Sequence, residues 1–176
     1  MDFSATLTTI VSFLDREEIR FALIGGLALS AYGHTRSTVD IDLVVELDHQ
    51  DAIIDFMHTS GFETLHRSLG YSNHRHADPT VGRVDFVYIG AETAAKMFGS
   101  ANKYESLSGL SIPVPKPEHL IAMKVLAMKN DPQRTLQELA DIAFLMARPE
   151  VDRDEIRRYF KRHGLVERFD ELERSL

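Results

Sequence analysis

Two aspartates stand two residues apart inside an apolar run, in the segment "VDIDLVV" at positions 39–45. A β-strand sends alternate side chains to opposite faces, so Asp40 and Asp42 share one face and the aliphatic residues around them share the other. Two carboxylates this close repel each other, and burying them without a partner is costly. The pair is therefore expected to face a divalent cation, to pair with Arg36 or Arg83, or to point into solvent.

The residues on either side of this strand favour the cation. Gly25 and Gly26 follow a short apolar strand and open a helix, where bare backbone N–H groups can receive a phosphate, although a tight turn explains the same two glycines. Asp85 lies in "GRVDFVYIG" between Val84 and Phe86, in the same kind of apolar strand. A third carboxylate from a neighbouring strand completes a set of oxygen ligands suited to Mg²⁺.

Periodicity divides the chain into two halves of different character. The first half mixes helices and strands, whereas the second is helical, and the proline-rich segment 108–118 separates them. The sequence predicts an α+β fold, in which a small mixed β-sheet with flanking helices occupies residues 1–116 and a helical bundle of residues 117–176 packs on it. In chain order, we expect helix 4–19, strand 20–25, a short helix closed by Gly33, strand 38–47, helix 49–61, strands 61–68 and 82–90, and helices 117–130, 131–148 and 151–164.

Composition restricts the class of protein. The 176 residues suffice for one well-buried core, and no apolar run approaches the ~20 residues that span a bilayer. Because the first residues are acidic and amphipathic, we expect a cytoplasmic protein without a signal peptide. The absence of cysteine excludes disulfides and thiolate metal sites, and the net charge of −7 disfavours an extended nucleic-acid footprint.

The segment "LIGGLALSAYGHTRSTVDIDLVV" and the later "VDFV" resemble the nucleotidyltransferase superfamily of the DNA polymerase β type. That superfamily has an apolar-Gly-Gly or apolar-Gly-Ser motif, then Asp-x-Asp, then a third aspartate on a later strand. The spacing is most similar to the small prokaryotic branch that includes AbiEii-type toxins and minimal nucleotidyltransferases. In that branch one helix of the tail carries a lysine and the next an aspartate, which map to Lys124 and Asp141. This sequence departs from the branch by having Glu138 at the earlier acidic position.

The resemblance implies transfer of a nucleoside monophosphate from a nucleoside triphosphate, ATP among them, to a hydroxyl of RNA or tRNA, a protein or a small molecule. It also implies two Mg²⁺ ions and a cognate antitoxin or toxin as a partner, but no membrane. The implied metal ligands and catalytic residues are Asp40, Asp42 and Asp85, joined by Lys124 in catalysis. The implied nucleotide-binding residues are Gly25, Gly26, Arg36, Thr38 and Asp141. Arg36 could equally well pair with an aspartate instead of binding the nucleotide. Lys124 could instead be a solvated residue on an amphipathic helix.

Two other groups of residues are better explained by ordinary structural roles than by function. His66, His74 and His76 with Asp78 invite a zinc site, but the turn-rich segment 68–82 favours a solvated hairpin loop. A basic group near the C-terminus favours an ordinary charged helix face over RNA contact; its members are Arg157, Arg158, Lys161 and Arg162. The alternative hypothesis, from a different class of function, is a non-catalytic interaction protein that keeps the nucleotidyltransferase scaffold. The presence of all three aspartates favours the enzyme over this alternative.

Overall fold

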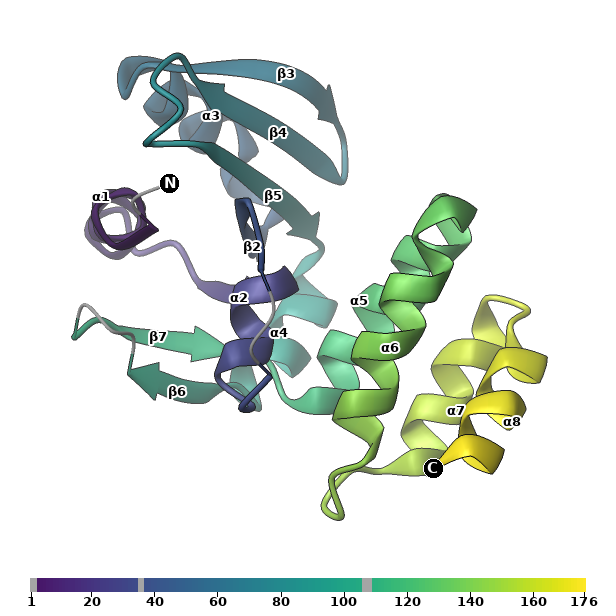
Figure 1. Cartoon of the computed structure of the whole chain (residues 1–176). Coiled ribbons are helices and arrows are strands. Elements are labelled where there is room, and N and C mark those ends of the chain that lie inside the picture. Colours follow the sequence, from purple (N-terminus) through teal and green to yellow (C-terminus); the bar gives the residue numbers. More distant parts are fainter. Residues whose placement is uncertain (1–2, 35–36, 106–108) are drawn as a thin grey trace. The chain divides into compact units, whose positions relative to one another are not determined.

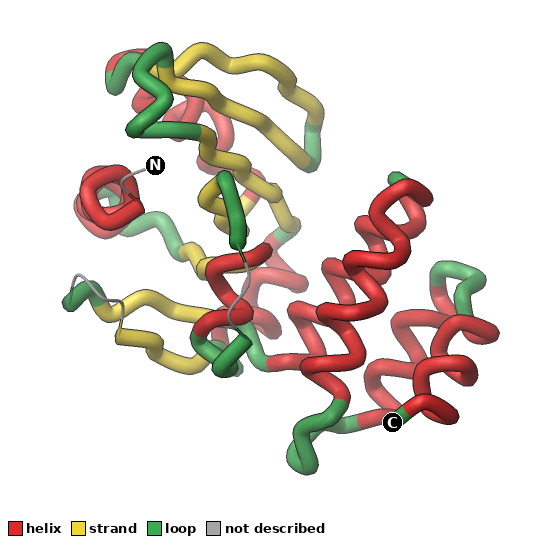
Figure 2. The backbone as a smooth tube through the Cα atoms, in the orientation of Figure 1, coloured by secondary structure: helices red, strands yellow, loops and turns green. Residues whose placement is uncertain are grey.

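The structure, a computed structural model, describes residues 3–34, 37–105 and 109–176. It divides into two compact units, Met1–Pro115 and Lys116–Leu176, each considered by itself. Figure 2 shows that the described strands belong to the first unit and that the second consists of helices and loops. The packing of the helical unit on the first unit stays a prediction.

The first unit is built on a five-stranded sheet of order β1-β2-β5-β4-β3. Strand β2 runs parallel to β5, and the other neighbours are antiparallel, which confirms the predicted mixed sheet and the α+β class. These strands are β1 Phe21–Ile24, β2 Asp40–Glu46, β3 Phe62–Ser68, β4 Tyr71–His76 and β5 Arg83–Ile89. A second sheet pairs β6 Asn102–Glu105 with β7 Ser111–Val114.

In the first unit one helix precedes β1 and the others lie in the connections between strands (Figure 1). They are α1 Phe3–Arg16, α2 Gly25–Ser30, the 3-10 turn η1 Leu47–His49, α3 Gln50–Thr59 and α4 Ala91–Gly99. The ring of Phe13 on α1 stacks on that of Phe56 on α3 with centroids 3.9 Å apart, so these two helices pack together. On the central strands, the face opposite Asp40 and Asp42 is fully buried, and it forms the hydrophobic core that fixes the sheet; its members include Ile41, Leu43, Val84 and Phe86.

The second unit contains one more helix than the sequence predicts. Its elements are α5 Pro117–Asn130, the 3-10 turn η2 Pro132–Arg134, α6 Thr135–Met146, α7 Arg153–Arg162 and α8 Val166–Ser175. The Asp152 side chain caps α7 by accepting a hydrogen bond from the backbone N–H of Glu155 at 2.9 Å. Helix α8 buries Phe169 and Leu172, which lie three residues apart on one face. This spacing is typical of an amphipathic helix.

Strand β4 corrects the prediction of a solvated loop over residues 68–82. Residues Tyr71–His76 form a strand between β5 and β3, and Ser72, Asn73 and His74 are buried. The polar sequence "YSNHRH" lacks the apolar alternation of a half-buried strand. It is stable as a strand because its buried side chains form hydrogen bonds with groups on β3 and β5.

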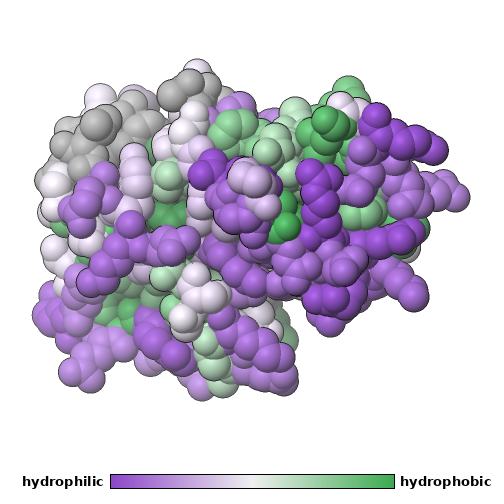
Figure 3. Space-filling view, turned by 90° about the horizontal axis from the view of Figure 1, so that it is seen from below, coloured by the Kyte–Doolittle hydropathy of each residue, from purple (hydrophilic) through white to green (hydrophobic). Residues whose placement is uncertain are grey.

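No helix within the described parts of the chain is long and apolar enough to cross a membrane. The face drawn in Figure 3 is mainly hydrophilic, with smaller apolar patches between the polar side chains.

Candidate active site

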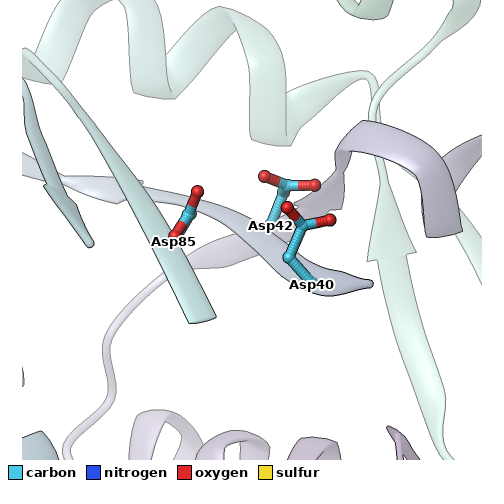
Figure 4. A group of neighbouring side chains, drawn as sticks. All are labelled: Asp40, Asp42 and Asp85. Carbon is cyan, nitrogen blue, oxygen red and sulfur yellow. The ribbon is translucent and has the colours of Figure 1, made fainter. Parts of the chain in front are cut away.

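Three carboxylates converge on one face of the sheet. Strands β2 and β5 are parallel neighbours, and their register places Asp42 directly opposite Asp85, while Asp40 precedes Asp42 by one full alternation of the strand. Oxygen atoms of the three side chains lie within 4.8 Å of one another. Figure 4 shows the three carboxyl groups on the same side of the two strands. The structure thus brings together the three aspartates that the sequence singled out.

Asp85 is held from the strand beyond it. Its Oδ2 accepts a hydrogen bond of 2.6 Å from the Tyr71 hydroxyl, and its Oδ1 accepts one from the Asn73 side-chain amide, both on β4. Asp85 is buried, and burial raises the pKa of its carboxyl group above the ordinary value. The two hydrogen bonds and the charge of Arg83 act in the opposite direction, and the charge of Asp40 raises the pKa further.

The other side of the cluster is formed by Thr38 and Gly25. The Thr38 hydroxyl donates a hydrogen bond of 2.8 Å to Oδ1 of Asp40. Gly25 begins α2 directly after β1 and has a φ of +66°, which a residue with a side chain rarely adopts. A Cβ atom at this position would lie 2.8 Å from the Cβ of Asp42 and closer still to its carboxylate. Glycine is therefore required here for the backbone to approach Asp42.

The chemistry of this donor set fits Mg²⁺. Three carboxylates supply hard oxygen ligands, and Mg²⁺ sites in proteins typically use a few carboxylates and leave further positions for substrate phosphate and water. Their mutual repulsion on one face gives a cation a favourable place to bind. Among the residues that the structure describes, these three aspartates are the group that could hold a metal ion.

A separate ionic cluster lies inside the second unit. The ammonium of Lys124 on α5 is 2.6 Å from Oδ2 of Asp141 and 2.9 Å from Oε2 of Glu138, both on α6. Arg134 also contacts Glu138, at 2.6 Å. Lys124, Glu138 and Asp141 are all buried, with exposed fractions of 6%, 2% and 1%. The alternative of a solvated Lys124 is therefore wrong, because two carboxylates hold its charge inside the helical unit.

Residues 12–176 match the family described as nucleotidyl transferase AbiEii toxin of type IV toxin–antitoxin systems. The chain belongs to the AbiEii family. It is accordingly a nucleotidyltransferase, as the glycine and aspartate motifs predict. No curated protein matches it by sequence.

Solved structures with the same fold are distant in sequence. A solution structure of the antibiotic-resistance factor ANT(2'')-Ia is 15% identical, with a TM-score of 0.68 over 99% of this chain and 98% of that one. A crystal structure of ANT(2'')-Ia in complex with adenylyl-2''-tobramycin is 13% identical, with a TM-score of 0.69 over 93% and 98%. The lincomycin-bound lincosamide antibiotic adenylyltransferase LnuA is 16% identical, with a TM-score of 0.59 over 81% and 96%. At these identities the likeness confirms the fold of the AbiEii chain.

The remaining residues predicted from the sequence are only partly covered by the described structure of this AbiEii member. Arg36 lies outside the described residues. Arg83 stands opposite Asp40 in the register of β2 and β5. Gly26 is buried in the first turn of α2, next to Gly25. The nucleotide-binding roles of Gly25, Gly26, Arg36, Thr38 and Asp141 stay predictions.

Sequence analysis missed Tyr71 and Asn73, the two partners of Asp85. Both lie on β4 at alternate positions, and Asn73 stands opposite Asp85 in the register of β4 and β5. The signal in the sequence was a tyrosine and an asparagine two apart before an apolar strand with an aspartate. The two residues can be related to Asp85 only when β4 is recognised as a strand that pairs with β5.

The candidate zinc residues do not converge in the described structure. His74 is fully buried in β4, whereas His66 on β3 is exposed and near Tyr71, and the ring of His76 packs edge-on against Phe62. Asp78 accepts hydrogen bonds from Thr80 in the turn that follows. The prediction of a solvated loop is wrong for Tyr71–His76, because these residues form strand β4.

Proposed function

We propose that the chain moves a nucleoside monophosphate from a nucleoside triphosphate to an acceptor hydroxyl in a Mg²⁺-dependent reaction. The observation that carries this proposal is the convergence of Asp40, Asp42 and Asp85 within 4.8 Å, with Gly25 against Asp42. Nucleotidyl transfer requires the attacking and leaving oxygens to lie in line at the α-phosphorus, and it depends mainly on positioning and on neutralising charge. A cluster of three anions at a glycine turn is suited to assembling a cationic site of that kind.

Each group receives a role from its chemistry. Asp40, Asp42 and Asp85 would hold two Mg²⁺ ions, which when bound would lower the pKa of the acceptor hydroxyl and offset the charge of the triphosphate. We assign to Asp85 the further role of accepting the proton of the acceptor hydroxyl. The hydroxyl oxygen then forms a bond to the α-phosphorus, the bond from this phosphorus to the bridging oxygen breaks, and pyrophosphate leaves.

Binding the nucleotide is the proposed role of a second group of residues. The backbone N–H groups of Gly25 and Gly26 would receive phosphate oxygens, since glycine has no side chain of its own beside the backbone. Thr38, through its hydroxyl on Asp40, would connect the nucleotide site to the metal ligands. Arg36, Lys124 and Asp141 complete the proposed set on the basis of the family motifs.

The family and the fold support proposals for the acceptor and the biological setting. The family's description as a type IV toxin supports a role as the toxin of a toxin–antitoxin pair, with the cognate antitoxin as a partner. ANT(2'')-Ia was crystallised with adenylyl-2''-tobramycin, and LnuA is an antibiotic adenylyltransferase. A small-molecule hydroxyl therefore stands beside tRNA and protein hydroxyls as an acceptor class for this chain.

Radiolabel transfer tests the proposal. The protein is incubated with Mg²⁺ and α-³²P-labelled ATP, CTP, GTP or UTP in a matched lysate, and labelled products are digested with nuclease or protease to identify the acceptor. Wild type is expected to label a product that Asp42→Asn does not label. Mg²⁺ with nucleotide should raise the melting temperature of wild type, because a ligand that binds only the folded state stabilises it, and should raise that of Asp42→Asn much less. A wild type that neither labels any product nor responds to Mg²⁺ and nucleotide overturns the enzyme assignment.

A further inference from the structure

We propose that Tyr71 and Asn73 are positioning residues that fix the carboxylate of Asp85 for metal binding, so that strand β4 is part of the active site. This inference rests on the proposed function of the three aspartates. It extends that function to a strand that lies outside the glycine, Asp-x-Asp and third-aspartate motifs described above.

The two donors reach Asp85 by a simple geometric rule of sheets. Asn73 stands directly opposite Asp85 in the antiparallel register of β4 and β5, so both side chains project from the same face. Tyr71 lies two residues earlier on β4 and therefore on this face too. The longer tyrosine side chain spans the extra distance and brings its hydroxyl to 2.6 Å from Oδ2 of Asp85.

Each oxygen of Asp85 accepts one of these hydrogen bonds. The Tyr71 hydroxyl takes Oδ2 and the Asn73 amide takes Oδ1, so the plane of the carboxylate is fixed at two points by one strand. A carboxylate held at one point or none rotates about its last torsion in a broad well. A carboxylate offers about four lone-pair sites, so both oxygens keep capacity to bind a cation after accepting these bonds.

The chemical nature of the donors supports a role in metal binding. Both are neutral, so they orient Asp85 without cancelling the negative charge that a cation requires. A lysine or arginine at either position would hold the carboxylate equally well but would repel the metal. Outer groups that hydrogen-bond to ligating side chains orient those ligands, and their loss typically weakens metal binding or activity about 10–100-fold.

Tyr88 offers a matched control for Tyr71. It lies on β5, three residues after Asp85 and on the opposite face, and its hydroxyl forms a hydrogen bond of 2.7 Å with Ser72. Tyr71→Phe and Tyr88→Phe each remove one hydrogen-bonded hydroxyl from the same part of the sheet. The difference between the two variants isolates the effect of a hydroxyl that faces the aspartates.

The experiment measures the binding of Mn²⁺ in the absence of nucleotide. The electron paramagnetic resonance signal of free Mn²⁺ reports how much of the ion is bound. Transfer kinetics and the metal-free melting temperature are measured beside it. Tyr71→Phe is expected to weaken Mn²⁺ binding about 10-fold and to lower kcat, with little change in KM for the nucleotide. Tyr88→Phe is expected to lower the melting temperature, while its Mn²⁺ affinity and kcat stay equal to those of wild type. Asn73→Ser, which replaces the amide donor with a hydroxyl on a shorter side chain and so moves the donor away from Oδ1 of Asp85, should reproduce the effect of Tyr71→Phe.

The outcomes separate this inference from the function on which it rests. If wild type binds Mn²⁺ and transfers label, while Tyr71→Phe and Asn73→Ser change Mn²⁺ affinity no more than Tyr88→Phe does, the positioning role is wrong and the proposed function stands. If wild type binds no Mn²⁺, the metal site itself is wrong and the positioning role falls with it. Should Tyr71→Phe fail to fold, the Mn²⁺ affinity of Asn73→Ser decides between these results.

Discussion

Protonation of His74 should destabilise the sheet in mild acid. His74 lies on β4 next to Asn73 but faces the opposite side, where it is fully buried. Its Nδ1 lies 3.1 Å from the Thr64 hydroxyl, and its Nε2 lies 2.8 Å from the Ser72 hydroxyl. Burial, with a smaller contribution from the charge of His58, lowers the pKa of His74 from 6.5 to about 4.

The size of the effect follows from the difference between the two pKa values. The unfolded chain takes up a proton on this imidazole near pH 6.5, whereas the folded protein takes it up only near pH 4. Between these values the unfolded state binds more protons, so stability falls as the pH falls. At about 1.4 kcal/mol for each pKa unit, the neutral His74 contributes about 3 kcal/mol above pH 6.5, and this contribution is lost by about pH 4.

Urea denaturation from pH 4 to pH 7.5 measures this contribution. The free energy of unfolding of wild type is compared with that of His74→Gln, which keeps a hydrogen-bonding side chain but does not titrate. Carboxylates elsewhere affect both proteins equally, so the difference between them should fall by about 3 kcal/mol between pH 7 and pH 4. His66→Gln, at an exposed position on β3, is the control and should stay within about 0.5 kcal/mol of wild type at each pH.

A difference that stays flat from pH 7 to pH 4 would refute the reasoning. The same conclusion would follow if the ring resonances of His74 in the folded protein changed near pH 6.5, because the imidazole would then be charged without cost. Either result would mean that the hydroxyl groups around His74 stabilise the imidazolium as well as water does.

Two further substitutions test the glycine turn and the ionic cluster of the helical unit. Gly25→Ala should destabilise the protein by more than about 1 kcal/mol and weaken Mn²⁺ binding, because its Cβ meets Asp42. Gly33→Ala, also at positive φ but with nothing within 4 Å of its Cβ, should cost stability only, and equal Mn²⁺ affinities for the two variants would contradict the close approach. Lys124→Met should cost up to about 3–5 kcal/mol in urea denaturation, because it removes the buried ammonium that lies 2.6 Å from Asp141 and 2.9 Å from Glu138, while Arg134 still contacts Glu138. An unchanged midpoint would show that the cluster contributes nothing to the folded state.

The sequence by itself determined the features that depend on local alternation. That Asp40 and Asp42 share one face follows from the two-residue period of a strand, and their apolar neighbours identify the buried face. The apolar flanks of Asp85 indicate a strand of the same kind. The order of these motifs along the chain also sufficed to predict the AbiEii family and the α+β class, both of which are confirmed.

Only the tertiary structure decided which strands are neighbours. The register that places Asp42 opposite Asp85, and Asp85 opposite Asn73, joins segments about 12 to 43 residues apart, and nothing local encodes such pairing. Strand β4 was hidden for the same reason. Its polar residues suit a loop until the neighbouring strands supply hydrogen-bond partners. Thr64 on β3 is the partner of His74, and Asp85 on β5 is the partner of Tyr71 and Asn73.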